Sequence, residues 1–72
     1  MMEETITKNN LKAIRERFCL NQKEMAKKLG VPAASLCRWE LQQRKIPALI
    51  AYKVCKLFNV SIWELFDFGK DD

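Results

Sequence analysis

The amino-acid sequence predicts an all-α fold: a compact bundle of five short helices and no strands. Apolar residues recur at helical spacing along most of the chain. Two segments open with the residue pair of a helix capping box, and glycine and proline separate the helical segments. The 72 residues suffice for one small domain, and the 49% hydrophobic content supplies enough apolar surface for a single core.

The first predicted helix begins near Asn9 and ends around Cys19. Its apolar stripe consists of Leu11, Ile14 and Phe18, which lie one and two turns apart along the same face. A helix with one apolar stripe buries that stripe against its neighbours. We therefore expect this segment to pack on these three side chains.

The second predicted helix begins after Asn21 and ends at Gly30. Asn21 has the side chain of an N-cap, and Glu24 three residues later completes a capping box. Leu20 before the cap and Met25 in the helix form the matching hydrophobic staple. Glycine ends the helix because it adopts the left-handed backbone conformation without steric strain.

The third and fourth predicted helices each begin at a proline, which needs no N–H at the first helical position. Pro32 opens the third helix, from which Leu36 and Trp39 face the core. Pro47 opens the fourth helix, which runs to about Phe58. The connections between the helices are short, as is typical of a compact bundle.

A second capping box, formed by Ser61 and Glu64, opens a short fifth helix. The five helices together make one domain over residues 9–66. We expect a flexible N-terminal tail at residues 1–8 and an acidic C-terminal tail at residues 67–72, because these segments have little apolar surface to bury.

Basic residues are concentrated in the middle of the chain. The net charge is +4, but residues 8–56 hold twelve of the thirteen Lys and Arg residues and only three of the nine acids. The segments at the two ends are acidic. This asymmetry favours a polyanionic partner at one face, and a solvated, lysine-rich surface is the alternative interpretation.

The composition argues against several kinds of site. The three cysteines have no C-x-x-C spacing and the chain has no histidine, so we expect no disulfide framework and no metal site. Without histidine, paired acids or a glycine-rich phosphate loop, we expect no catalytic residues, no cofactor and no enzymatic activity. Free thiols and the lack of a long apolar run predict a cytoplasmic protein without a membrane partner.

Residues 20–40 carry the most informative motif of the chain. It reads Leu-Asn-Gln-x-Glu-x-Ala-x-x-Leu-Gly-Val from Leu20, and then continues with Leu36, Trp39 and Glu40. This motif resembles the helix-turn-helix of the phage repressor and Cro-type (XRE-like) family. The resemblance covers residues 9–66, because Val-Ser-Ile-x-Glu-Leu-Phe at residues 60–66 resembles the closing helix of that family.

The resemblance implies both a fold and a function. The fold is the five-helix bundle of the phage-repressor DNA-binding domain, in which the second and third helices form the helix-turn-helix. The function is sequence-specific binding of double-stranded DNA by a transcriptional regulator, of the repressor kind, with the third helix in the major groove. The partner would be an operator, palindromic if the protein binds as a homodimer.

The resemblance also implies which residues contact DNA. Gln22 matches the family position that clamps a phosphate at the start of the second helix, and Arg38 is the candidate for reading a guanine. Arg44 and Lys45 match positions that grip the sugar-phosphate backbone. The complete predicted set is Asn21, Gln22, Lys23, Ala33, Ala34, Ser35, Arg38, Arg44 and Lys45.

Other positions that the resemblance singles out concern the architecture. Arg15 and Glu40 match a buried arginine–glutamate pair that ties the first helix to the end of the third. Cys19 stands where the family often has glycine, so a left-handed backbone there would strain the cysteine. Leu41 and Gln42 replace the Asn-Gly of the family, and the third helix is therefore expected to run longer or to end differently.

The fourth predicted helix is apolar around its circumference at its start, which a surface helix does not need. We hypothesise that Leu49, Ile50, Trp63 and Phe68 form a two-fold dimer interface that places two third helices about 34 Å apart on DNA. An extended core around this helix is the alternative.

The rival function is a protein-binding adaptor or antitoxin-like module with weak or no DNA readout. No small-molecule ligand is expected.

Overall fold

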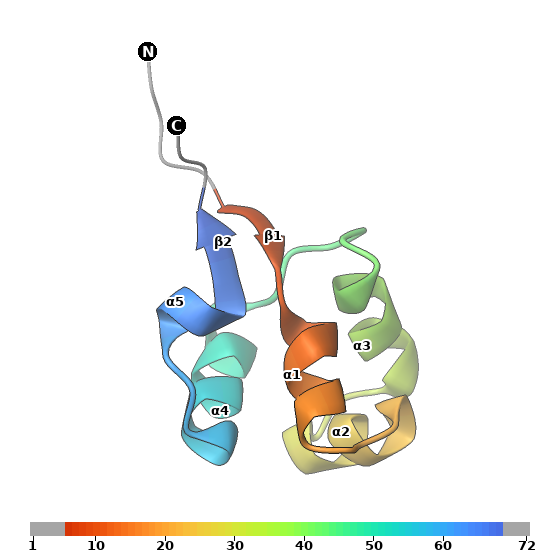
Figure 1. The fold of residues 1–72 in the computed structure, drawn as a ribbon. Coiled ribbons are helices and arrows are strands. Elements are labelled where there is room, and N and C mark those ends of the chain that lie inside the picture. Colours follow the sequence, from red (N-terminus) through yellow and green to blue (C-terminus); the bar gives the residue numbers. More distant parts are fainter. Residues whose placement is uncertain (1–5, 69–72) are drawn as a thin grey trace.

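The computed structural model of the chain describes residues 6–68. Within this range it contains two strands and five helices: β1 (Ile6–Asn9), α1 (Leu11–Arg17), α2 (Gln22–Leu29), α3 (Ala33–Glu40), α4 (Ala48–Phe58), α5 (Ile62–Leu65) and β2 (Phe66–Phe68). Figure 1 shows α1, α2 and α3 on one side of the molecule and α4 and α5 on the other. The two strands lie above the helices in this view. The prediction of a mostly helical five-helix fold is confirmed.

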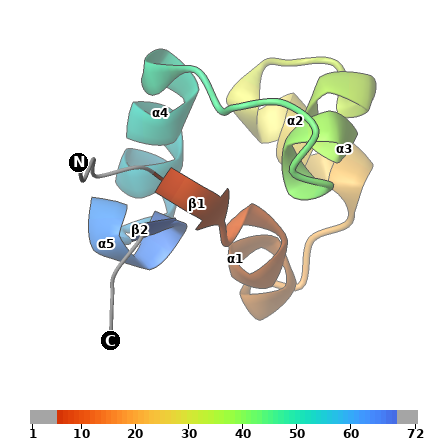
Figure 2. The same cartoon turned by 90° about the horizontal axis from the view of Figure 1, so that it is seen from above.

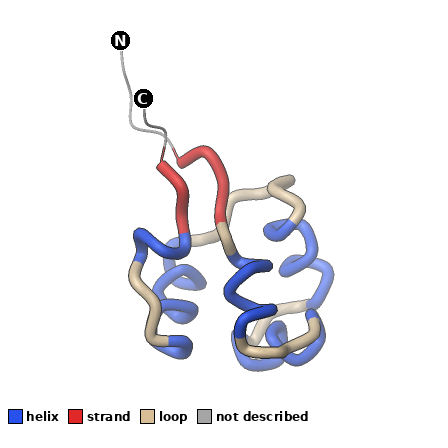
Figure 3. The backbone as a smooth tube through the Cα atoms, in the orientation of Figure 1, coloured by secondary structure: helices blue, strands red, loops and turns tan. Residues whose placement is uncertain are grey.

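The expectation that the fold has no strands is wrong. β1 and β2 pair antiparallel, with Ile6 opposite Phe68 and Asn9 opposite Phe66, and the register is irregular between Ile6 and Lys8. The red tube in Figure 3 shows the two strands side by side at the ends of the chain. Strands this short carry too few residues for an alternating pattern to show in the sequence. Part of each segment predicted as a tail therefore belongs to the folded domain.

The core takes apolar side chains from every helix. Those that are essentially inaccessible to solvent are Leu11, Ile14, Met25, Leu29, Leu36, Val54 and Leu65. Burying an aliphatic side chain of this kind contributes about 1.5–3 kcal/mol relative to leaving it exposed. The helices thus close around one shared core, and no helix within residues 6–68 is long and apolar enough to cross a lipid bilayer.

Both predicted capping boxes are confirmed. At the start of α2 the Asn21 side chain accepts a hydrogen bond from Glu24 N–H at 2.8 Å, and Glu24 Oε1 accepts from Asn21 N–H at 2.8 Å. Ser61 and Glu64 make the same reciprocal pair before α5, at 3.2 and 3.3 Å. Each box satisfies two N–H donors that a helix start leaves unpaired.

Four helices end in a left-handed residue, and only one of these four residues is glycine. In each case the N–H of the following residue bonds back to a carbonyl five positions earlier, which is the closing bond of a Schellman motif. The four residues and their φ angles are Cys19 (59°), Gly30 (74°), Gln42 (63°) and Asn59 (54°). Gly30 has the left-handed conformation that the sequence predicts. Cys19 is left-handed as well, which is the case in which its side chain strains the backbone. Gln42 shows how α3 ends after Glu40 without the glycine of the family.

Other details differ from the sequence-based expectations. Pro32 and Pro47 keep extended backbones, with ψ of 144° and 148°, so α3 and α4 begin one residue later than expected. α1 begins at Leu11 because Asn9 is part of β1. Phe18 lies after the end of α1 and is partly exposed. Its ring packs against the ring of Phe58, with 4.9 Å between the ring centroids.

Candidate nucleic-acid interface

The turn between α2 and α3 consists of residues 30–32 only. Gly30 is left-handed, and Val31 N–H donates to Ala26 O at 3.0 Å. A Cβ on Gly30 would meet only Lys53 Nζ, at 3.9 Å, so backbone conformation rather than space requires glycine here. Figure 2 shows α2 and α3 crossing at the edge of the molecule opposite α5. α3 therefore lies at an edge of the molecule along its whole length.

One face of α3 is buried and the other faces solvent. Leu36, Trp39 and Glu40 are buried, at helical spacing. Ala34 and Arg38, one turn apart, are exposed on the opposite face. The predicted contacts Ala33 and Ser35 are half-buried beside them. α3 therefore offers a narrow, accessible face with one cation in its last turn, and the one acid of the helix points inward.

Glu40 is the centre of a buried ionic network. Arg15 Nε donates to Glu40 Oε2 at 2.7 Å and Arg15 Nη2 donates to Oε1 at 3.1 Å, with side-chain exposures of 11% and 3%. The hydrogen bond to Glu40 raises the pKa of Arg15 above its ordinary value, against the opposing effect of burial, and the charge of Glu40 raises it further. Arg15 Nη1 also donates to Leu20 O at 2.9 Å. The network ties α1 to the end of α3.

The predicted phosphate ligand Gln22 belongs to the same network. Gln22 Nε2 donates to Glu40 Oε1 at 2.9 Å. This bond fixes the orientation of the carboxamide at the start of α2, and the same nitrogen carries a second N–H that can donate elsewhere. Asn21 and Lys23, on either side, are exposed. The structure thus places these three predicted residues together at one helix start, beside the C-terminal end of α3.

The turn after α3 is held by a contact that the sequence analysis missed. Gln42 Oε1 accepts from Asn9 N–H at 3.0 Å, and Gln42 Nε2 donates to Asn9 O at 3.2 Å. Arg44 and Lys45, which follow in this turn, are exposed. No local pattern could reveal the contact, because its two residues are 33 positions apart.

The charge of this region is strongly one-sided. Residues 21–45 are described throughout, and in them a single exposed acid, Glu24, stands among several exposed cations. These cations are Lys23, Lys27, Lys28, Arg38, Arg44 and Lys45. Outside this region, Arg17 pairs with Glu64 at 3.4 Å and Lys8 pairs with Asp67 at 3.9 Å, so an acid lies beside both Arg17 and Lys8. The six exposed cations of residues 21–45 make the surface around α2, α3 and the turn that follows strongly positive.

Comparison with known protein families matches residues 11–65 to the family described as Helix-turn-helix. The chain belongs to the helix-turn-helix family. The resemblance to XRE-like proteins is confirmed by this match, which extends from α1 to α5.

Curated relatives of this helix-turn-helix chain agree in length as well as in sequence. An uncharacterized HTH-type transcriptional regulator of Methanocaldococcus jannaschii is 34% identical over 65 residues, which are 90% of this chain and 98% of the relative. Two proteins of Archaeoglobus fulgidus with the same description are each 28% identical over 65 residues. The match covers 90% of this chain in both cases, and 92% and 93% of the two relatives.

The residues hypothesised as a dimer interface do not all reach the surface of the helix-turn-helix domain. Leu49 and Trp63 do, with 64% and 70% of their surface exposed. Ile50 is 8% exposed and belongs with Val54 to the buried core cluster, so it offers almost no surface to a second copy. One side of α4 is therefore core, as the alternative interpretation held for this residue. The side chain of Phe68 lies outside the described residues.

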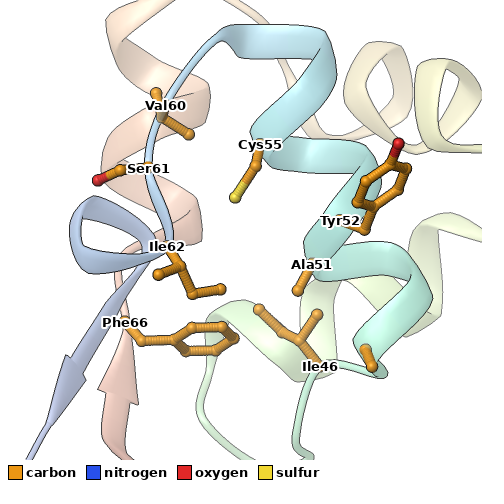
Figure 4. Close-up of a pocket in the computed structure, with 9 residues that line it drawn as sticks. Ile46, Ala51, Tyr52, Cys55, Val60, Ser61, Ile62 and Phe66 are labelled. Carbon is orange, nitrogen blue, oxygen red and sulfur yellow. The ribbon is translucent and has the colours of Figure 1, made fainter.

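An apolar hollow of about 610 Å3 lies away from the helix-turn-helix, between α4 on one side and α5 with β2 on the other. Its lining residues are Ile46, Ala48, Ala51, Tyr52, Cys55, Val60, Ser61, Ile62 and Phe66. Figure 4 shows the Cys55 thiol and the Phe66 ring on its walls. Burial raises the pKa of Cys55, and the charge of Glu64 raises it further, so the thiol stays protonated at neutral pH.

Proposed function

We propose that this chain is a sequence-specific regulator of transcription that binds double-stranded DNA and represses by occupying an operator. The observation that carries the proposal is the outward face of α3, which is accessible, free of exposed acids and surrounded by the exposed cations of residues 21–45. The family match and the names of the relatives, all HTH-type transcriptional regulators, support it.

In this proposal α3 lies in the major groove. Arg38 is the residue that reads a base, because its guanidinium can donate two hydrogen bonds to guanine O6 and N7. Ala33 and Ala34 can touch only thymine methyl groups, and Ser35 can reach a base or a phosphate. With so few polar readers, a large share of the specificity comes from the shape and deformability of the DNA.

Phosphates on both sides of the groove hold the domain in register. Gln22 contacts one phosphate at the start of α2, in the orientation that its bond to Glu40 gives it. Asn21 and Lys23 assist there, and Arg44 and Lys45 contact the backbone from the turn after α3. Each ionic contact with a phosphate lowers log K by about 0.9 for every tenfold rise in salt.

The regulator binds as a homodimer on a palindromic operator in this proposal. Leu49 and Trp63 are large, exposed and apolar, and they lie on α4 and α5, two of the three helices outside the helix-turn-helix. A two-fold contact through this side of the domain would leave both copies of α3 free to reach successive turns of the same groove.

The rival function is a protein-binding adaptor or antitoxin-like module on the same scaffold. The exposed apolar side chains of α4 and α5 and the hollow between these helices are the observations that favour it. An adaptor of this kind would bind its partner through α4 and would keep its binding when the cations around α3 are removed.

The experiment that separates the two functions measures the binding of random and selected duplexes by fluorescence anisotropy. Arg38→Ala is expected to weaken binding of the selected duplex by about 1–3 kcal/mol, which is about 5- to 150-fold in Kd. Arg17→Ala removes the same charge from an exposed residue of α1 and serves as the matched control. Equal effects of the two substitutions, or no binding by the wild type, would contradict the proposal.

A further inference from the structure

The turn that follows α3 contains a residue type that its backbone disfavours. Gln42 has a φ of 63°, its N–H donates to Trp39 O at 3.0 Å, and Gln43 N–H donates to Arg38 O at 2.9 Å. These bonds form a Schellman motif, in which glycine usually occupies the position of Gln42. A side chain at this position strains the backbone. Such strain persists where the surrounding structure fixes it, and it then points to a role for the side chain.

The carboxamide of Gln42 makes three hydrogen bonds to the main chain. Oε1 accepts from Asn9 N–H at 3.0 Å, and Nε2 donates to Asn9 O at 3.2 Å and to Glu40 O at 3.1 Å. Gln42 therefore binds both main-chain groups of Asn9, as the peptide group of a neighbouring strand would do. On its other side Asn9 lies opposite Phe66 of β2. The side chain of Gln42 thus covers the outer edge of β1 at this residue.

Asn9 is itself a firm anchor. It is buried, its Nδ2 donates to Trp39 O at 2.9 Å, and its Oδ1 accepts from Leu11 N–H at 3.0 Å. The Asn9–Gln42 contact therefore joins β1, the start of α1 and the end of α3 at a single point. Arg44 and Lys45 follow two and three residues after Gln42, and both are exposed.

We propose that Gln42 is a positioning residue for DNA, which holds the turn after α3 so that Arg44 and Lys45 meet the sugar-phosphate backbone together. The inference rests on the proposed function. A turn fixed before binding spares the complex the entropy of ordering the backbone and two long side chains. Gln42 itself contacts no phosphate in this arrangement, and its effect on binding passes through the two cations.

The test is a mutant cycle on the full chain. Gln42→Gly keeps a residue suited to the left-handed backbone and removes the carboxamide. Asn59→Gly makes the same kind of change at the end of α4, where Asn59 is also left-handed, and is the matched control. Gln42→Asn is a second variant. Asparagine tolerates the left-handed backbone, but its side chain is one methylene shorter and holds the carboxamide farther from the main chain of Asn9. Each is combined with the double substitution of Arg44 and Lys45 by alanine.

The readout is the Kd for a random-sequence duplex at several NaCl concentrations, with urea unfolding to show that each variant is folded. Gln42→Gly and Gln42→Asn are expected to weaken binding several-fold. They should also reduce the magnitude of the slope of log K against log salt by about 0.9 or more, because at least one phosphate contact is lost. Removing both cations should then have much less effect than in the wild type. A loss of stability alone would leave this slope unchanged, and Asn59→Gly should leave both affinity and slope unchanged.

Three results would overturn the inference, in two distinguishable ways. If the wild type binds the duplex and Gln42→Gly binds with the same slope, or if removing the two cations has an equal effect in both backgrounds, Gln42 does not position them. If the wild type binds no duplex at low salt, the proposed function fails, and this inference fails with it.

Discussion

The buried pair of Arg15 and Glu40 gives the sharpest prediction about stability. Glu40→Ala removes both hydrogen bonds from the Arg15 guanidinium and the bond from Gln22 Nε2, and it leaves a cation with 11% of its side chain exposed. Breaking one partner out of a buried ion pair costs about 3–5 kcal/mol. A chain of 72 residues has a total free energy of unfolding of about 4–11 kcal/mol. The variant is therefore expected to lose a large part of its free energy of unfolding and, at the low end of this range, all of it.

Urea unfolding followed by the fluorescence of the two tryptophans measures this loss. Lys8→Ala is the control, because it removes an exposed pair with a distance of 3.9 Å and should change stability by less than about 1 kcal/mol. Because the pKa of Arg15 is raised in the folded domain, its contribution is fully present below the ordinary pKa of arginine and is lost only in strongly alkaline solution, as the pH rises through the raised value. A loss below about 1 kcal/mol for Glu40→Ala would refute the reasoning that the pair holds α3 on α1.

Three further predictions concern other parts of the domain. Cys19→Gly should raise the free energy of unfolding by up to about 1 kcal/mol in urea titrations by relieving a left-handed backbone, and no gain would contradict the strain. Iodoacetamide should alkylate Cys55 more slowly than the exposed Cys19, because the raised pKa of Cys55 lowers the fraction of its thiol that is ionised. Equal alkylation rates in mass spectrometry would contradict this prediction. Trp63→Ala should lower the dimer fraction in sedimentation on DNA. Leu57→Ala, which removes a 53% exposed apolar side chain of α4 that is not in the proposed interface, should not; equal behaviour would argue against that interface.

Features that depend on residues close in sequence could be predicted from the sequence. Both capping boxes join residues three positions apart, and Gly30 ends α2 through its own backbone preference. The residue types alone therefore indicate these features. The starts of α3 and α4 were predicted to within one residue, since a proline fixes φ but leaves ψ free to stay extended.

Features that depend on distant residues could not be predicted from local patterns, and the pair of Arg15 and Glu40, 25 positions apart, was expected only from the family resemblance. β1 and β2 stand at opposite ends of the chain, and the contact between Asn9 and Gln42 spans 33 residues. The burial of Ile50 depends on how α4 rotates against the core, which an apolar segment without a clear stripe does not define. The bond between Gln22 and Glu40 likewise requires α2 and α3 to be docked first.

The most direct test of the central claim maps the DNA contact onto the domain. The amide signals of the isotope-labelled protein are followed by NMR while a duplex selected for binding is added. If the exposed face of α3 binds DNA, the largest changes occur at residues 33–38 of α3, at the start of α2 and at residues 42–45. Changes centred instead on α4 and α5, with α3 unaffected, would contradict the claim that the exposed face of α3 binds DNA.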